Sequence, residues 1–210
     1  MSVQENIMAA NIITITREFG SGGRTIGRQV ADTLGYTFYD WELVMKIAQE
    51  SGFDADFVSE NCEDSSSRFS WLFKDAGKGM DLSDQLYCAM SRVVEEIASK
   101  GKCVLVGRCA DYILRERTDV LSCFIFADEE FKKERIVNVY GETEKSIDRR
   151  LKEKDGKRKS HYQYYTGRKW GRAFYYDVCL DSGRLGIDNC TSTIVALAKE
   201  IGDHQKPRED

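Results

Sequence analysis

A glycine-rich turn is the part of this sequence whose residue types and spacing most clearly imply chemistry. Gly20, Gly22 and Gly23 fall within four positions, between an apolar run and a helical pattern. Glycine lets the backbone curl so that successive N–H groups converge. The start of the following helix adds the positive end of its dipole. The turn therefore predicts a cradle for phosphate groups, formed by Gly20, Ser21, Gly22, Gly23, Arg24 and Thr25.

Two side chains at the end of the turn have predicted roles of their own. Arg24 would bring positive charge to the β- and γ-phosphates, and the Thr25 hydroxyl would be a ligand of Mg²⁺. Against the pattern GxxxxGK[ST], residues Gly23 to Thr25 fit the last three positions with Arg in place of Lys, and Glu18 holds the first glycine position. A strand–helix turn without a ligand is the alternative. The dinucleotide pattern GxGxxG fits less well, because Thr25 stands at its last glycine.

A strongly basic segment lies later in the chain. Residues 149–172 contain ten Lys or Arg and two acidic residues, a net +8 in a chain of net charge −4, so the rest of the chain carries −12. Phosphoryl transfer spreads negative charge over the γ-phosphoryl oxygens, which guanidinium groups stabilise at close range. We expect this basic segment to form a lid that closes over the bound substrates. A solvated charged helix face and an RNA-binding patch are the alternatives, and the acidic remainder argues against general nucleic-acid binding.

Five short apolar runs have to position these groups. They lie at 12–15, 36–39, 103–106, 121–126 and 178–180, and helical patterns alternate with them. Unbroken apolar runs are typical of strands that are buried on both faces of a parallel sheet, with helices on each side. We therefore predict an α/β fold with three layers, namely a P-loop NTPase fold with a parallel five-stranded sheet.

Two stretches lack this alternation, the Ser-rich 54–79 and the basic 152–172. We expect both to be irregular insertions at the carboxyl edge of the sheet, where ligands bind in such folds. No apolar run approaches the length of a membrane span, and the first ten residues lack the pattern of a signal peptide. The seven cysteines form no CxxC pair, which indicates reduced, mostly buried thiols in a cytoplasmic protein rather than a metal site or catalytic thiol.

Three segments carry a resemblance to a known family. The first runs from Ile15 to Arg24 and continues through residues 34–36 and 38–40, the second is Val104 to Leu114, and the third and weakest is Leu180 to Ile187. Together they resemble the cytidylate kinase-like family, a branch beside the bacterial CMP kinases. The resemblance covers roughly residues 11–200, which is nearly the whole chain.

The resemblance implies a nucleoside monophosphate kinase domain over residues 11–202, with an acceptor-binding insertion at 54–79, a lid at 152–172 and flexible tails at 1–10 and 203–210. It places Arg108 on the acceptor phosphate and Asp40 near the acceptor nucleotide, while Cys109 stands where the family has an Asp. In the lid, it implies that Arg150 and Arg158 clamp phosphates, that Asp155 orients the acceptor or an arginine, and that Lys154 contacts substrate. The catalytic set is then Arg24, Arg108, Arg150, Asp155 and Arg158.

Three hypotheses for function stay open. The first is transfer of a phosphoryl group from ATP to CMP or dCMP with Mg²⁺, in a cytoplasmic enzyme that takes a small-molecule nucleotide substrate and binds neither nucleic acid nor membrane. The second is a kinase of another small acceptor. The third is a regulatory module that binds a nucleotide without turnover. The sequence does not indicate an oligomeric state.

Overall fold

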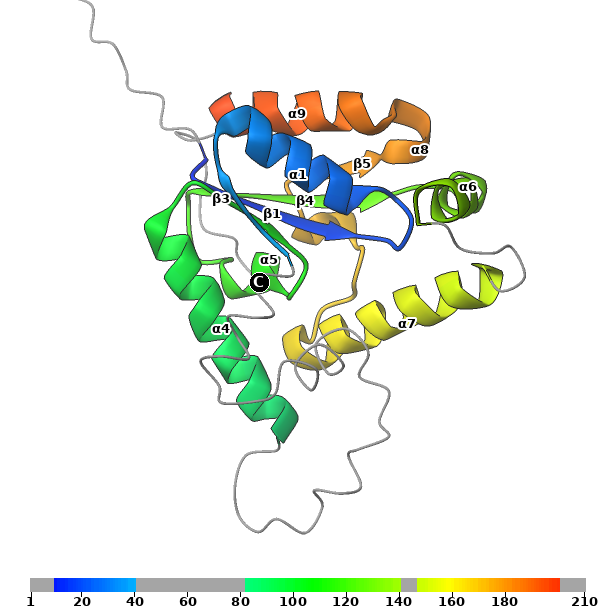
Figure 1. The fold of residues 1–210 in the computed structure, drawn as a ribbon. Helices are drawn as coiled ribbons and strands as arrows, with labels where there is room; N and C mark the ends of the chain where they lie inside the picture. The colour runs from blue at the N-terminus through cyan, green and yellow to red at the C-terminus, as the bar shows by residue number, and fades with distance from the viewer. Residues whose placement is uncertain (1–9, 41–81, 141–146, 201–210) are drawn as a thin grey trace, which may run out of the picture.

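A five-stranded parallel sheet forms the centre of the protein (Figure 1). The computed structural model describes residues 10–40, 82–140 and 147–200. The strands are β1 (Ile12–Arg17), β2 (Thr37–Tyr39), β3 (Cys103–Val106), β4 (Val120–Phe126) and β5 (Val178–Asp181), in the order β2-β3-β1-β4-β5. Every neighbouring pair is parallel. The predicted fold class is confirmed, and all five strands fall where the apolar runs placed them.

Helices cover both faces of the sheet (Figure 1). On one face lie α1 (Gly23–Leu34) and α9 (Ile187–Glu200), and on the other lie α4 (Leu82–Lys100) and α5 (Ala110–Ile113). Side chains of β1 alternate between the two layers: Ile13 and Ile15 pack in the cluster that contains α1 and α9, and Ile12 packs in the cluster that contains α4. Because both faces are buried, unbroken apolar runs were the right signal for these strands.

The remaining helices are α6 (Glu129–Tyr140), α7 (Ile147–Thr166), the 3-10 turn η2 (Ala173–Tyr175) and α8 (Ser182–Leu185). Asp128 caps α6, since its Oδ1 accepts a hydrogen bond of 2.9 Å from the Phe131 amide. The expectation that 152–172 is irregular was wrong, because α7 runs without a break to Thr166. Its residues are good helix formers, and pairs such as Glu153–Lys157 at 3.2 Å support the helix from its own surface.

Several other expectations have an outcome in the described residues. The insertion at 54–79 and the tail at 203–210 lie outside those residues. Ala10, which we placed in the N-terminal tail, is buried, and its amide donates to the Ala198 carbonyl at 2.7 Å. None of the six cysteines within the described ranges forms a disulfide, and four of them are buried. Across the same ranges, no helix combines the length and apolar character that a membrane span requires.

Candidate active site

The glycine turn lies between β1 and α1 at the carboxyl edge of the sheet. Gly20 and Gly22 both have φ of +81°, which L side chains rarely adopt, and Gly22 is the N-cap of α1. Gly20, Gly22 and Gly23 are buried. Among the described residues, the amides of Gly20, Gly22, Gly23 and the first helical residues Arg24 and Thr25 have no hydrogen-bond acceptor. Buried backbone amides are rarely left unpaired, so these amides fit an anionic ligand such as the phosphates of ATP.

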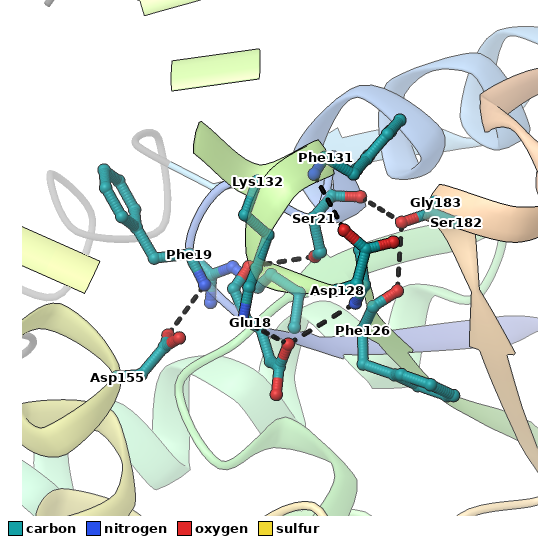
Figure 2. A network of polar contacts seen from close by, with 12 residues as sticks. Glu18, Phe19, Ser21, Phe126, Asp128, Phe131, Lys132, Asp155, Ser182 and Gly183 are labelled. Carbon is teal, nitrogen blue, oxygen red and sulfur yellow. Dashed lines mark hydrogen bonds and ion pairs between the residues drawn. The ribbon is translucent and has the colours of Figure 1, made fainter. Parts of the chain in front are cut away.

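The surrounding elements hold the turn in place with polar contacts of their own (Figure 2). The Glu18 carboxylate pairs with Lys132 of α6 at 2.9 Å, and it accepts a longer hydrogen bond of 3.4 Å from the Ala127 amide. On the other side, the Ser182 hydroxyl lies 2.6 Å from the Ser21 carbonyl oxygen and 3.1 Å from the Phe126 carbonyl oxygen. The residue that occupies the first glycine position in the predicted pattern is therefore a structural anchor of the turn.

Thr25, the predicted magnesium ligand, is in contact with an arginine. Arg135 of α6 donates from Nη2 to Thr25 Oγ1 at 2.6 Å. A guanidinium at this distance repels a divalent cation, so Thr25 does not fit a magnesium ligand in this arrangement. No group of three or more His, Cys, Asp or Glu side chains in the described ranges could hold a metal ion. The role of Thr25 toward Mg²⁺ stays a prediction that requires Arg135 to move.

Arg24, the predicted phosphate-binding cation, points toward the end of β2. Its Nε lies 2.5 Å from Asp40 Oδ2, and its side chain is 60% exposed. A second arginine approaches the same carboxylate, since Arg17 Nη2 lies 4.0 Å from Asp40 Oδ1. Arg24, which we predicted to bind the phosphates of ATP, therefore pairs with Asp40, which we predicted to lie near the acceptor nucleotide.

A second candidate site follows β3. Gly107, Arg108 and Cys109 have φ of +78°, +64° and +54°, three left-handed residues in a row. For the two that are not glycine this conformation is strained by about 1–3 kcal/mol each. Arg108 is only 9% exposed, and its Nε and Nη1 are buried without a hydrogen-bond partner in the described part of the chain. The backbone of Arg108 is strained, and its buried guanidinium lacks hydrogen-bond partners in the described residues. Both features point to an anionic ligand at this position.

A small cavity of ≈ 40 Å³ opens beside this strained segment. Three arginines from different elements line it: Arg17 at the end of β1, Arg108 after β3 and Arg158 of α7. Its other lining residues are Thr16, Gly107, Cys109, His161, Tyr162 and Trp170. We call this site the arginine pocket. Three guanidinium groups around one small cavity suit a phosphate group, which each can bind through paired hydrogen bonds.

Helix α7 brings the predicted lid residues to the glycine turn. Arg150 and Arg158 lie over the Phe19 ring, with 6.0 Å and 5.8 Å from guanidinium carbon to ring centroid. Asp155 accepts a hydrogen bond of 2.7 Å from the Phe19 amide through Oδ1. Burial raises the pKa of Asp155 even though this amide and Arg158 favour the ionised form. Lys154 lies four residues from both arginines, on the same face of the helix.

A buried network attaches the far end of α7 to the arginine pocket. Asp111 of α5 accepts hydrogen bonds from the Tyr162 hydroxyl at 2.6 Å and from the Thr16 hydroxyl at 3.2 Å. Burial, followed by the charge of Asp111, raises the pKa of Tyr162 far above its usual range, so this hydroxyl stays protonated and donates. The network fixes α7 against the sheet next to Arg108.

The structure brings most of the predicted residues to one edge of the sheet, but in two groups. Arg108 and Arg158 meet in the arginine pocket, while Arg24 and Asp40 pair beside it. Sequence reasoning missed four residues that build these sites: Arg17, Asp111, Arg135 and Tyr162. Arg17 could have been found from the sequence, because it stands five positions before Gly22, where the pattern GxxxxGK[ST] has its first glycine. Arg135 carries no such signal, because only the packing of α6 brings it to α1.

The chain matches known proteins along most of its length. The model of the cytidylate kinase-like family matches residues 12–184. A cytidylate kinase from Methanopyrus kandleri is 24% identical over 205 residues, which cover 93% of this chain and 97% of that relative.

Solved structures show the same fold. An uncharacterised protein from Eubacterium ventriosum is 26% identical with a TM-score of 0.67, covering 89% of this chain and 97% of its own. A shikimate kinase from Acinetobacter baumannii, solved with shikimate, has a TM-score of 0.50 at 15% identity, with 91% and 94% covered. A shikimate kinase from Bacteroides thetaiotaomicron has a TM-score of 0.51 at 14% identity, with 89% and 97% covered. At these identities, the shikimate kinases show the fold alone.

Proposed function

Because the chain belongs to the cytidylate kinase-like family, we propose that this phosphotransferase moves the γ-phosphoryl group of ATP to CMP or dCMP. The glycine turn would hold the phosphates of ATP, and the arginine pocket would hold the acceptor's phosphate. The observation that carries the proposal is Arg108: its buried Nε and Nη1 lack a partner in the described residues, and the residue lines a cavity together with two more arginines.

The chemical step requires positioning and charge stabilisation rather than a base. An oxygen of the acceptor phosphate forms a bond to the γ-phosphorus, and the bond from that phosphorus to the bridging oxygen breaks. The electron pair of the broken bond stays on the β-phosphate of ADP. No proton has to move, because the attacking oxygen is already anionic. In our proposal Arg158 stabilises the transferred group, since it belongs to the arginine pocket and lies over Phe19 of the turn.

The arginine pocket favours an acceptor that carries a phosphate over one that offers only a hydroxyl. Three of the lining residues are arginines, which bind the oxygens of a phosphate group, whereas a hydroxyl offers them no anionic group. The relative named as a cytidylate kinase favours CMP among the monophosphates. Mg²⁺ is expected in the reaction as in kinases generally, and no step here depends on it.

A coupled ADP-release assay with purified full-length protein tests the proposal. ATP and Mg²⁺ are present throughout, and CMP, dCMP, UMP, AMP and shikimate are added one at a time. We expect CMP or dCMP to give the highest kcat/KM. A different best acceptor would make the protein a kinase of that compound. Binding of an ATP analogue without turnover of any acceptor would make it a regulatory module.

Two variants test whether CMP-dependent ADP release requires the arginine pocket. Arg108→Ala should abolish stimulation by CMP and leave the affinity for an ATP analogue unchanged. The matched control is Lys100→Gln, which removes an exposed cation that pairs with Glu96 at 2.6 Å on α4. Lys100→Gln should keep full activity. If Arg108→Ala retains its stimulation by CMP, the assignment of the arginine pocket to the acceptor is wrong.

A further inference from the structure

We propose that Arg17, rather than Arg24, supplies the cation that faces the transferred phosphoryl group at the glycine turn. The proposal rests on the function proposed above and assigns one further residue to it. Arg17 is the last residue of β1, and its side chain is 11% exposed. It lies where the glycine turn and the arginine pocket meet, whereas the Arg24 side chain is 60% exposed. Both arginines approach Asp40, Arg24 at 2.5 Å and Arg17 at 4.0 Å.

The spacing of the glycines supports this assignment. In GxxxxGK[ST] the second glycine follows the first by five positions, and the lysine comes next at the start of the helix. Helix α1 begins at Gly23, and Gly22 is its N-cap. With Gly22 as the second glycine, the first glycine position holds Arg17 and the lysine position holds Gly23. Relative to the usual pattern, the cation and one glycine have exchanged positions: Arg17 replaces the first glycine, and Gly23 replaces the lysine.

The geometry agrees with such an exchange. A Cβ built on Gly23 would lie 2.5 Å from Arg17 Cβ and 3.0 Å from Arg17 Cγ. The two side-chain positions therefore share one space, and only one of them can be filled. In this protein Arg17 fills it, so position 23, the first residue of α1, must be glycine.

The guanidinium of Arg17 also has a glycine beside it. A Cβ on Gly107 would lie 2.0 Å from Arg17 Nη1 and 3.2 Å from its Cζ. Gly107 directly precedes Arg108, so the end of the Arg17 side chain lies beside the proposed acceptor site. The carbonyl of Arg17 accepts a hydrogen bond of 3.3 Å from Arg158 Nη1, which attaches the same residue to α7. A cation between donor and acceptor sites can stabilise the charge that develops on the group in transit.

The experiment compares Arg17→Met with Arg24→Met. The wild-type protein must first show CMP- or dCMP-dependent ADP release, and failure at this stage counts against the proposed function, not against the role of Arg17. We then expect Arg17→Met to lower kcat/KM by about 100- to 1,000-fold and Arg24→Met by less than about tenfold. The matched control is Arg117→Met, because Arg117 pairs with Asp119 at the opposite, amino-terminal edge of the sheet. It should keep wild-type activity.

Binding provides a readout that does not depend on turnover. Calorimetric titration should show that Arg17→Met weakens a non-hydrolysable ATP analogue at least tenfold and leaves adenosine affinity almost unchanged, because adenosine carries no phosphate. Thermal unfolding of each variant checks that the fold persists. A larger loss in Arg24→Met than in Arg17→Met, in either kcat/KM or analogue affinity, would overturn the proposal.

Reversing the exchange gives a second test. The double variant Arg17→Gly/Gly23→Lys places glycine and lysine in the usual order. Its kcat/KM should be at least tenfold higher than that of Arg17→Met. Gly23→Lys alone should be unstable or inactive, because its side chain meets that of Arg17. A folded double variant that is no more active than Arg17→Met would contradict the exchange.

Discussion

The glycine turn and the arginine pocket lie side by side, yet they prepare for a phosphate in opposite ways. In the turn the binding groups are backbone amides, and the nearby side chains are already paired: Glu18 with Lys132, and Thr25 with Arg135. In the arginine pocket the binding groups are side chains, and Arg108 keeps two buried nitrogen atoms without a partner in the described chain. In the turn the groups without a partner are backbone amides, while in the arginine pocket they are the nitrogen atoms of a buried side chain.

The two sites also differ in which of their features lower the stability of the folded protein. The amides of the turn lie at or beside a helix start, where no intrahelical acceptor exists, and its glycines adopt positive φ without strain. The arginine pocket holds a buried charge and two strained residues, Arg108 and Cys109, in the left-handed region. We therefore expect changes in the turn to affect stability and binding together, and changes in the arginine pocket to separate them.

Replacing Arg108 by glycine should separate them most clearly. Arg108→Gly removes the guanidinium and relieves the strain of a φ of +64°. CMP-dependent kcat/KM should fall by about 100- to 1,000-fold, while the ligand-free protein should become more stable by about 1–3 kcal/mol. Steady-state ADP release and urea unfolding measure the two effects. A loss of both activity and stability would mean that Arg108 is structural.

Two alanine substitutions at the ends of α1 test the glycine turn. Gly22 and Gly35 both have positive φ, but a Cβ at Gly22 would lie 2.4 Å from Ile187 Cδ1, and one at Gly35 would meet nothing within 4 Å. Gly35→Ala should cost about 1–2 kcal/mol from strain alone, and Gly22→Ala about 1–3 kcal/mol more from the collision. Only Gly22→Ala should also weaken the ATP analogue. Urea unfolding and calorimetry measure these effects, and equal losses in the two variants would contradict the close packing at Gly22.

Tyr162→Phe tests the network that attaches α7 beside the arginine pocket. It removes the donor to Asp111 Oδ2, which lies 2.6 Å from the hydroxyl, and should cost about 1–3 kcal/mol because a buried carboxylate oxygen loses its partner. We expect kcat to change less than KM for CMP, since the network positions Arg108 without touching substrate. Urea unfolding and initial rates provide the values. Unchanged stability would show that the network contributes little.

The smallest effect is expected at Asp155, beside the turn. Burial raises the pKa of this carboxyl, so the folded state holds the proton more tightly than the unfolded state. The contribution of Asp155 to stability is therefore full at low pH and is lost as the pH rises through the raised pKa. Asp155→Asn, which cannot ionise, should gain stability relative to wild type as the pH rises above about 4, the ordinary pKa of an aspartate side chain. Urea unfolding across that range measures the difference, and an opposite slope would mean that the Phe19 amide and Arg158 dominate over burial.

The sequence by itself determined the sheet and the position of the glycine turn. Unbroken apolar runs can only be buried on both faces, so the runs at 12–15 and 103–106 had to be central strands of an α/β fold. Gly20, Gly22 and Gly23 marked a strand–helix turn able to direct several amides at a ligand. The basic 149–172 was recognisable as a charged surface near the site, but its charge pattern concealed the regular helix α7, which buries few of its side chains.

Only the tertiary structure showed where each arginine side chain lies. Arg24 follows the glycines in sequence, yet its guanidinium pairs with Asp40, while Arg17 lies against Gly23 and Gly107. Thr25 is adjacent to the turn, yet Arg135 from a distant helix donates to it. An arginine side chain is long enough to reach any of several neighbours. Its partner is therefore fixed by the carboxylates and open spaces that other elements bring within reach, and the order of residues along the chain does not contain that information.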